Sequence, residues 1–65
     1  MPRLASVHWR TLESVFLRAG FTFVRQVGSH RAYTGKGTLR PVVIPTYDHV
    51  PVFIIKNNLK VAGLS

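Results

Sequence analysis

The sequence predicts a small α+β domain with the order helix, three-stranded antiparallel meander, helix. Three observations predict it: an early segment with apolar residues at helical spacing, a middle region that reads as paired strands, and a short closing helical pattern. A three-stranded sheet with two helices on one face would bury both apolar helix faces and leave the other sheet face open. Because 65 residues suffice for one domain, we expect a single domain over residues 1–65.

The first helix is expected over Trp9 to Ala19. Its apolar residues recur at the spacing of one helical face: Leu12, Val15, Phe16 and Ala19. Gly20 follows at the position where a helix commonly ends in a left-handed residue. The N-terminal boundary is less sharp, because either Ser6 or His8 could precede the first turn.

Three strands are expected over Phe21–Val27, Ser29–Thr34 and Leu39–Ile44. The turn between the first two is expected at Val27-Gly28, with Gly28 supplying a positive φ. Side chains alternate along a strand, so one face of the second strand should carry Ser29, Arg31 and Tyr33, and the other His30, Ala32 and Thr34. By aromatic periodicity, Phe16, Phe21 and Phe23 are expected in the core.

The closing helix is expected from Val52 or Ile54 to Ala62. Ile55, Leu59 and Ala62 would then face inward, and Gly63 would cap the C-terminus.

The charge balance is strongly basic. Nine Lys and Arg oppose only Glu13 and Asp48, which gives a net charge of +7. Such an imbalance predicts nucleic acid or an acidic protein as partner, although a solvated basic surface alone would also account for it.

Metal sites and membrane segments are disfavoured. The chain has no cysteine, and His8, His30 and His49 do not have the spacing of zinc ligands. We therefore expect no metal and no cofactor. The longest apolar stretch, 50–55, is too short to cross a bilayer, so no membrane association is expected. The lack of cysteine is consistent with a cytoplasmic location.

The most informative motif is Gly28-Ser29-His30-Arg31. It places an imidazole just after the expected turn, between a hydroxyl and a guanidinium. Histidine is the side chain best suited to both accept and donate a proton near neutral pH. A lone strand histidine is nevertheless more often a surface residue, so the motif alone does not establish catalysis.

Several short motifs, in their order along the chain, resemble the HicA (YcfA-like) toxin family. They are Met1–Leu4, Gly20-Phe21, Arg25–Arg31, Val43–Pro45 and Ala62–Ser65. The resemblance implies a fold like the double-stranded RNA-binding domain and a toxin that cleaves mRNA without a metal or the ribosome. It further implies that His30 is the catalytic residue and that a HicB-type antitoxin holds the toxin inactive.

The chain departs from the family pattern near its C-terminus. Tyr47 stands where many members have histidine, Phe53-Ile54-Ile55 replaces Gly-Thr-Leu, and Asn58 occupies an apolar helix position. The second helix is therefore a candidate to begin earlier, with Asp48 as its cap and Pro51 in its first turn. The apolar Val52–Ile54 patch is a candidate contact for a partner or for a second copy.

RNA carries its own nucleophile, the 2′-hydroxyl, so His30 would act as general acid or base while a cation stabilises the phosphorane. The candidate RNA-binding residues are Ser29, Arg31, Arg25, Lys36 and Arg40. By alternation Arg31 faces away from His30, and the sequence does not choose among the other cations as the phosphate clamp. Tyr33 could either stack on a base or cover a sheet face.

Two other functions remain open at this stage. One is a non-catalytic RNA-binding module, which reads RNA shape and phosphates without needing a histidine. The other is a degenerate, inactive toxin that survives as a protein-binding element. The sequence leaves the oligomeric state and the RNA sequence preference undetermined.

Overall fold

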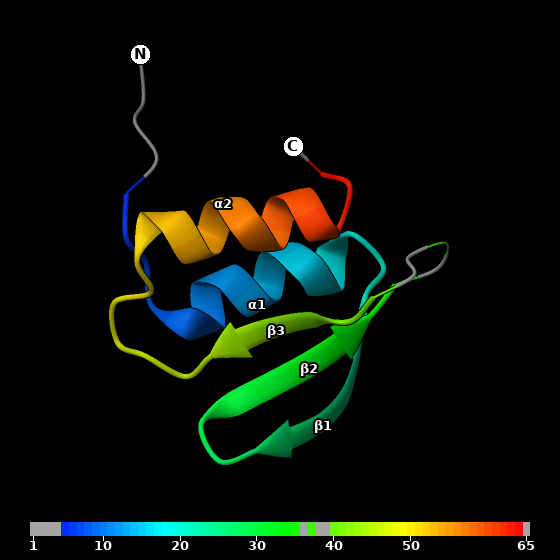
Figure 1. Ribbon diagram of the computed structural model, residues 1–65, viewed down its shortest axis with the longest axis horizontal. Helices are drawn as coiled ribbons and strands as arrows, with labels where there is room; N and C mark the ends of the chain where they lie inside the picture. Colours follow the sequence, from blue (N-terminus) through cyan, green and yellow to red (C-terminus); the bar gives the residue numbers. More distant parts are fainter. Residues whose placement is uncertain (1–4, 36, 38–39, 65) are drawn as a thin grey trace.

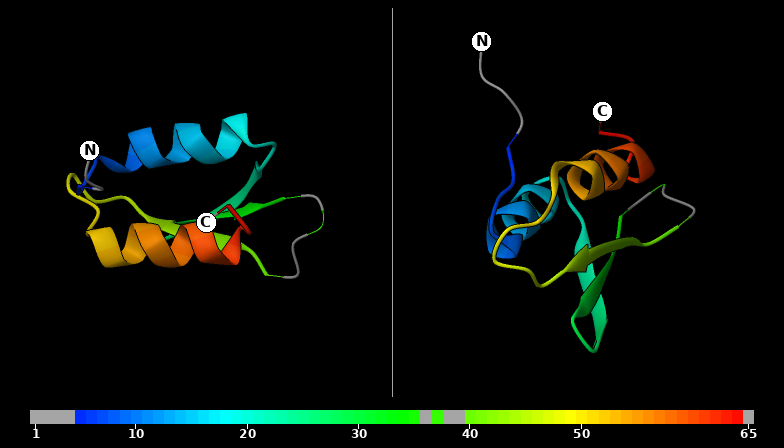
Figure 2. Two further views of the ribbon diagram at one scale, coloured as in Figure 1. Left: turned by 90° about the horizontal axis from the view of Figure 1, so that it is seen from above. Right: turned by 60° about the vertical axis from the view of Figure 1, so that its left-hand side comes forward.

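The computed structural model describes residues 5–35, 37 and 40–64 and has the element order expected from the sequence. Helix α1 (Trp9–Arg18) is followed by β1 (Thr22–Val27), β2 (His30–Thr34), β3 (Val42–Pro45) and helix α2 (Val52–Val61). The strands form one antiparallel sheet in the order β1-β2-β3. Both helices lie on the β3 side of the molecule, and the β1–β2 hairpin projects away from them (Figures 1 and 2). The α-β-β-β-α prediction is confirmed.

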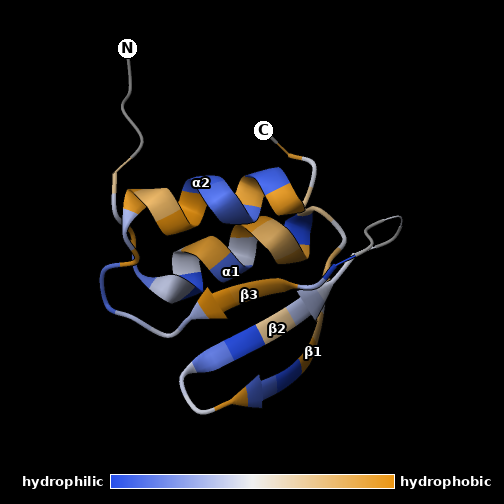
Figure 3. Cartoon of the chain, viewed as in Figure 1, coloured by the Kyte–Doolittle hydropathy of each residue, from blue (hydrophilic) through white to orange (hydrophobic). Residues whose placement is uncertain are grey.

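The core lies between the helices and the strands β2 and β3. Its fully or nearly buried side chains come from every layer: Leu12, Phe16, Phe21, Tyr33, Val42, Ile44, Val50, Ile55 and Ala62. Figure 3 shows the same division, with β3 hydrophobic and the hairpin end of β1 and β2 largely hydrophilic. Val15 and Ala19 were expected on the inner face of α1 but are exposed. Only Leu12 and Phe16 of this helix are buried, so its contact with the core is narrower than the apolar pattern predicts.

The ends of α1 follow local rules. The His8 side chain is the N-cap, and its Nδ1 accepts a hydrogen bond from the Arg10 amide at 3.1 Å. Of the two residues that could precede the helix, the structure therefore selects His8. At the other end Ala19 is the C-cap and Gly20 follows with φ +94°, a conformation that glycine adopts without steric penalty.

The prediction that Asp48 caps the N-terminus of α2 is wrong. Pro51, rather than Asp48, is the N-cap, and it offers no side-chain hydrogen bond. The Asp48 carboxylate instead lies 3.6 Å from His8 Nε2. The reason is tertiary: Val7 and Val50 form a bridge that ties this connection to the start of α1 and carries Asp48 away from the α2 N-terminus.

The β1–β2 hairpin has a two-residue loop, Gly28-Ser29, because Val27 pairs with His30. The turn is thus one residue later than expected. Gly28 has φ +59° and Ser29 has a negative φ, which is the pattern of a type II′ turn with glycine in its first central position. The predicted role of Gly28 in the turn is confirmed.

A β-bulge interrupts β1 between Phe23 and Arg25. Phe23 pairs with Tyr33, but Arg25 pairs with Ala32 instead of with Arg31. Since directly paired residues share a face of the sheet, the bulge moves Arg25 onto the face that carries His30. Phe23, expected in the core, remains 40% exposed at this edge of the sheet.

Tyr33 anchors a polar cluster on the helix side of the sheet. It is fully buried, and its hydroxyl donates a hydrogen bond to Glu13 Oε2 on α1. Arg31 donates to the same carboxylate oxygen at 3.1 Å and to the Tyr33 hydroxyl at 3.0 Å. The hydrogen bond to the Tyr33 hydroxyl raises the pKa of Arg31. Burial raises the pKa of Tyr33, and its hydrogen bond to Glu13 raises it further. Of the two roles open to Tyr33, the structure shows the structural one.

The raised pKa of Tyr33 predicts a loss of stability at alkaline pH. Unfolded tyrosine ionises near its ordinary pKa of 10.0, whereas folded Tyr33 resists ionisation. Its contribution to the free energy of unfolding is therefore fully present below about pH 10 and is lost as the pH rises through the folded pKa. Urea unfolding between about pH 8 and 11 should show a falling midpoint for the wild type and a smaller fall for Tyr33→Phe. Equal falls for the two proteins would contradict this assignment.

Candidate nucleic-acid interface around His30

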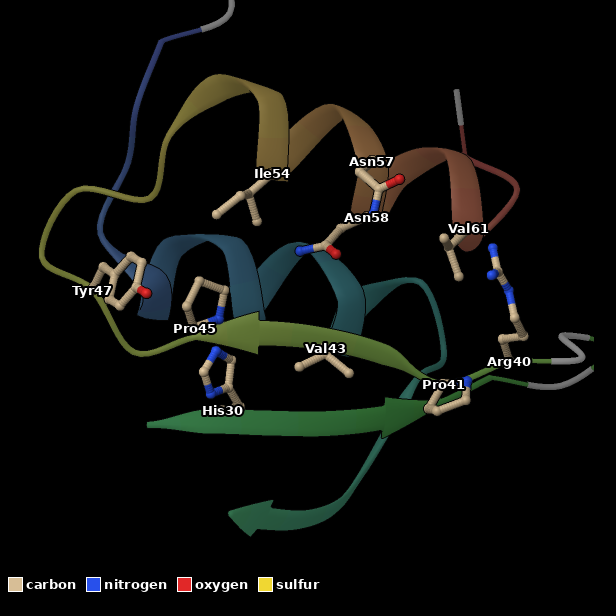
Figure 4. A pocket seen from close by; sticks show the side chains of 10 residues that line it. All are labelled: His30, Arg40, Pro41, Val43, Pro45, Tyr47, Ile54, Asn57, Asn58 and Val61. Atoms are coloured by element: carbon tan, nitrogen blue, oxygen red, sulfur yellow. The ribbon is translucent and has the colours of Figure 1, made fainter. Parts of the chain in front are cut away.

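An open groove runs between α2 and the exposed face of β2 and β3 (Figure 4). It has a volume of about 510 Å³, within the size range of ligand sites. The residues that line it are His30, Arg40, Pro41, Val43, Pro45, Tyr47, Ile54, Asn57, Asn58 and Val61. Most of the wall is apolar, so the few polar side chains define what the groove can recognise.

His30 is fixed in this groove by its backbone rather than by side-chain contacts. It is the first residue of β2 and pairs with Val27 on one side and Pro45 on the other. The preceding carbonyl, that of Ser29, accepts hydrogen bonds from the Thr46 amide at 2.7 Å and from Thr46 Oγ1 at 3.1 Å. The turn is therefore tied to the segment after β3, and the exposed imidazole extends toward α2 (Figure 4).

Two of the predicted cations accompany His30. Arg40 lines the groove at the end opposite Tyr47 (Figure 4), and Arg25 is exposed on the same sheet face as His30 because of the bulge. Lys36 lies outside the described residues. Ser29 lies in the turn next to His30. The groove and the sheet face that carries His30 therefore hold two exposed arginines, each able to pair with a phosphate of an RNA backbone.

Arg31, the fourth predicted cation, lies on the opposite face, as strand alternation predicts. Its guanidinium carbon lies 4.0 Å from the centre of the Phe23 ring and 5.1 Å from that of Trp9. Together with its ion pair to Glu13, these contacts hold Arg31 against α1. The geometry thus favours a structural role for Arg31 and separates it from a ligand at His30.

The groove lining contains no carboxylate. The chain has only two acidic residues, and both lie elsewhere, in contact with other side chains. Glu13 faces Arg31 and Tyr33, and Asp48 faces His8. A polyanion bound at His30 would meet no fixed negative charge in the groove. Over residues 5–35, 37 and 40–64, no cluster of three or more His, Cys, Asp or Glu side chains is placed to hold a metal ion.

Three polar residues of the groove wall were not predicted as site residues: Tyr47, Asn57 and Asn58. Tyr47 and Asn58 each stood out in the sequence only as departures from a family pattern. Asn58 is 4% exposed, and its Nδ2 is the one buried side-chain nitrogen or oxygen without a hydrogen-bond partner in the described part of the chain. A buried amide left without a partner costs about 1–3 kcal/mol. Such a group in the wall of a groove is a candidate donor to a ligand.

The patch Val52–Ile54 lies on the first turn of α2. Phe53 is 72% exposed, whereas Val52 and Ile54 are partly buried, and Ile54 lines the groove. The patch therefore divides into one outward aromatic ring, a partly buried valine, and Ile54, which packs against the core. Neither described helix is long and apolar enough to span a membrane.

Comparison with known proteins identifies the family. The family described as the HicA toxin of bacterial toxin–antitoxin systems matches residues 9–64. The match includes both helices, all three strands and every residue of the groove lining. No curated protein and no solved structure matches the chain.

Proposed function

We propose, from the premise that this chain belongs to the HicA toxin family of bacterial toxin–antitoxin systems, that the toxin is an endoribonuclease. It cleaves mRNA without the ribosome and without a metal, and His30 is its general acid or base. The observation that carries this proposal is the place of His30: an exposed imidazole in a carboxylate-free groove of a +7 chain, with Arg40 in the same groove.

The chemistry needs only what RNA and this groove provide. The 2′-oxygen attacks the adjacent phosphorus as its proton leaves, and a bond from the 2′-oxygen to phosphorus forms. The bond between phosphorus and the 5′-oxygen breaks, and that oxygen takes up a proton. The products are a 2′,3′-cyclic phosphate and a 5′-hydroxyl. Histidine can accept the first proton or donate the second, and such help contributes typically about 10²–10⁴-fold.

The cations around the groove would hold the phosphate during this step. Arg40 lies in the groove and Arg25 lies on the same sheet face, so each could contact phosphate oxygens with its planar guanidinium. We assign Ser29 and Lys36 to RNA contacts of the same phosphate backbone. Arg31, held by Glu13 on the far face, stabilises the strand that presents His30.

A ribonuclease assay tests this function. Purified protein should cut RNA in the presence of EDTA and leave 2′,3′-cyclic phosphate and 5′-hydroxyl ends. A substrate with a single 2′-deoxynucleotide at the cut site should resist cleavage there, because it lacks the nucleophile. Binding without cutting would instead indicate an RNA-binding module, and failure to bind or cut would indicate an inactive toxin.

The antitoxin partner follows from the family, and we propose that it is a HicB-type protein that covers the groove. A +7 toxin attracts an acidic partner and associates with it fastest at low salt. Occlusion of His30 would then inhibit without a change in the toxin fold.

Chemical labelling of histidine tests this occlusion. We expect diethyl pyrocarbonate to modify both His30 and His49 in the free toxin, since both are exposed. In the complex, His30 should be protected while His49 continues to react, as mass spectrometry of peptides would show. Unchanged labelling of His30 in an inhibited complex would contradict occlusion.

A further inference from the structure

Asn58 combines burial, an unused donor and a position in the groove wall. Its Nδ2 has no hydrogen-bond partner although the residue is 4% exposed. It lies on the inner side of α2 between the apolar core residues Ile55 and Ala62. Figure 4 shows its side chain directed from α2 toward β3, across the groove from His30 and Val43. Because Nδ2 itself is covered, an acceptor in the groove would satisfy this amide once the Asn58 side chain turned its Nδ2 toward the groove.

The surroundings of Asn58 favour a neutral, flat acceptor over a phosphate. The groove wall around it is apolar, with Val43, Ile54 and Val61 as neighbours in the lining. A phosphate is better matched by the exposed Arg40 at the groove end. Nucleobases instead present carbonyl oxygens and ring nitrogens on apolar rings, and proteins read single-stranded RNA by hydrogen bonds to these edges. A groove of about 510 Å³ falls in the range that holds such a group.

We propose that Asn58 is a specificity-determining residue that donates a hydrogen bond from its amide to the base edge of an RNA nucleotide held in this groove. The inference rests on the proposed ribonuclease function. It adds to that function the group of the RNA substrate that the protein recognises, the edge of one base. It places base recognition on α2 and proton transfer on β2, at opposite walls of one groove.

A buried water molecule is the alternative partner for this amide. Under that alternative Asn58 would matter for packing alone, and its replacement would leave base preference unchanged. The two explanations therefore differ in a measurable property.

The test uses binding in a cleavage-deficient background, so that RNA remains intact. Fluorescence anisotropy of His30→Ala with short oligoA, oligoC, oligoG and oligoU should show a preference of about tenfold or more between best and worst, typical of one base-edge contact. Adding Asn58→Leu should reduce that preference to within about twofold, while affinity for the poorest oligonucleotide stays nearly constant. Asn58→Ala serves as a second variant that removes the amide without adding bulk.

Phe53→Leu is the control on the same helix, since Phe53 is exposed, lies outside the groove lining and is replaced without a change of charge. Equal affinity of His30→Ala for all four oligonucleotides would overturn the inference, as would a preference that survives both Asn58 variants. An equal loss of preference in Phe53→Leu would also overturn it. Absence of RNA binding and of cleavage by the wild type would instead overturn the proposed function, and the inference with it.

Discussion

His30→Ala should reduce the rate of RNA cleavage by about 10²–10⁴-fold and leave the folded domain intact. The loss follows because no other histidine lines the groove. The fold should survive because His30 is exposed on the open face and is not part of the buried core. Single-turnover cleavage in EDTA gives the rate, and circular dichroism with thermal unfolding reports the fold.

His49→Ala is the matched control for this variant. His49 is also exposed, but it lies outside the groove lining. The His49→Ala variant should cleave RNA like the wild type, and its expression in cells should arrest growth. Expression of His30→Ala should leave growth unaffected. A His30→Ala protein that still cuts RNA at the wild-type rate would show that the acid–base assignment is wrong.

Tyr33→Ala should unfold most of the protein at room temperature. Truncation of a fully buried aromatic side chain costs about 3–5 kcal/mol. A small domain has about 0.05–0.15 kcal/mol of stability per residue, so a single loss of this size removes much or all of it. The same change also removes the hydroxyl that donates to Glu13 and accepts from Arg31.

Tyr33→Phe separates these two contributions. The ring and its packing remain, and only the hydroxyl is lost, so we expect a decrease of about 1–3 kcal/mol in the free energy of unfolding. Urea unfolding at neutral pH measures both variants, and RNA cleavage by Tyr33→Phe should remain near the wild-type rate. A wild-type unfolding midpoint for Tyr33→Ala would contradict the central place of this residue in the core.

The fold was predictable because local patterns and tertiary packing agree over most of the chain. The helical spacing of Leu12 and Phe16, and the glycine after α1, determine that helix without reference to the rest of the chain. The α2 cap was not predictable in the same way. Asp48 is a favourable cap by type, but the bridge between Val7 and Val50 redirects it, and a single strand-like pair far apart in sequence leaves no local signal.

The candidate site was predictable where it depends on alternation along one strand. That rule correctly separated His30 from Arg31 across β2. The position of Arg25 depends on a one-residue bulge, which the alternation rule does not reveal. The burial of Asn58 depends on how α2 packs over β3, because its polar type predicts exposure on a helix.

The division of β2 between its two faces has an evolutionary consequence. One face holds the domain together through Tyr33 and Arg31, while the other presents His30 to solvent. Under the proposed function, single substitutions on the open face would therefore remove toxicity without unfolding the protein. Variants that lose toxicity this way and still bind the antitoxin would remain folded and compete for it, so an inactivated copy of such a gene would still change how much antitoxin is left for its active relatives.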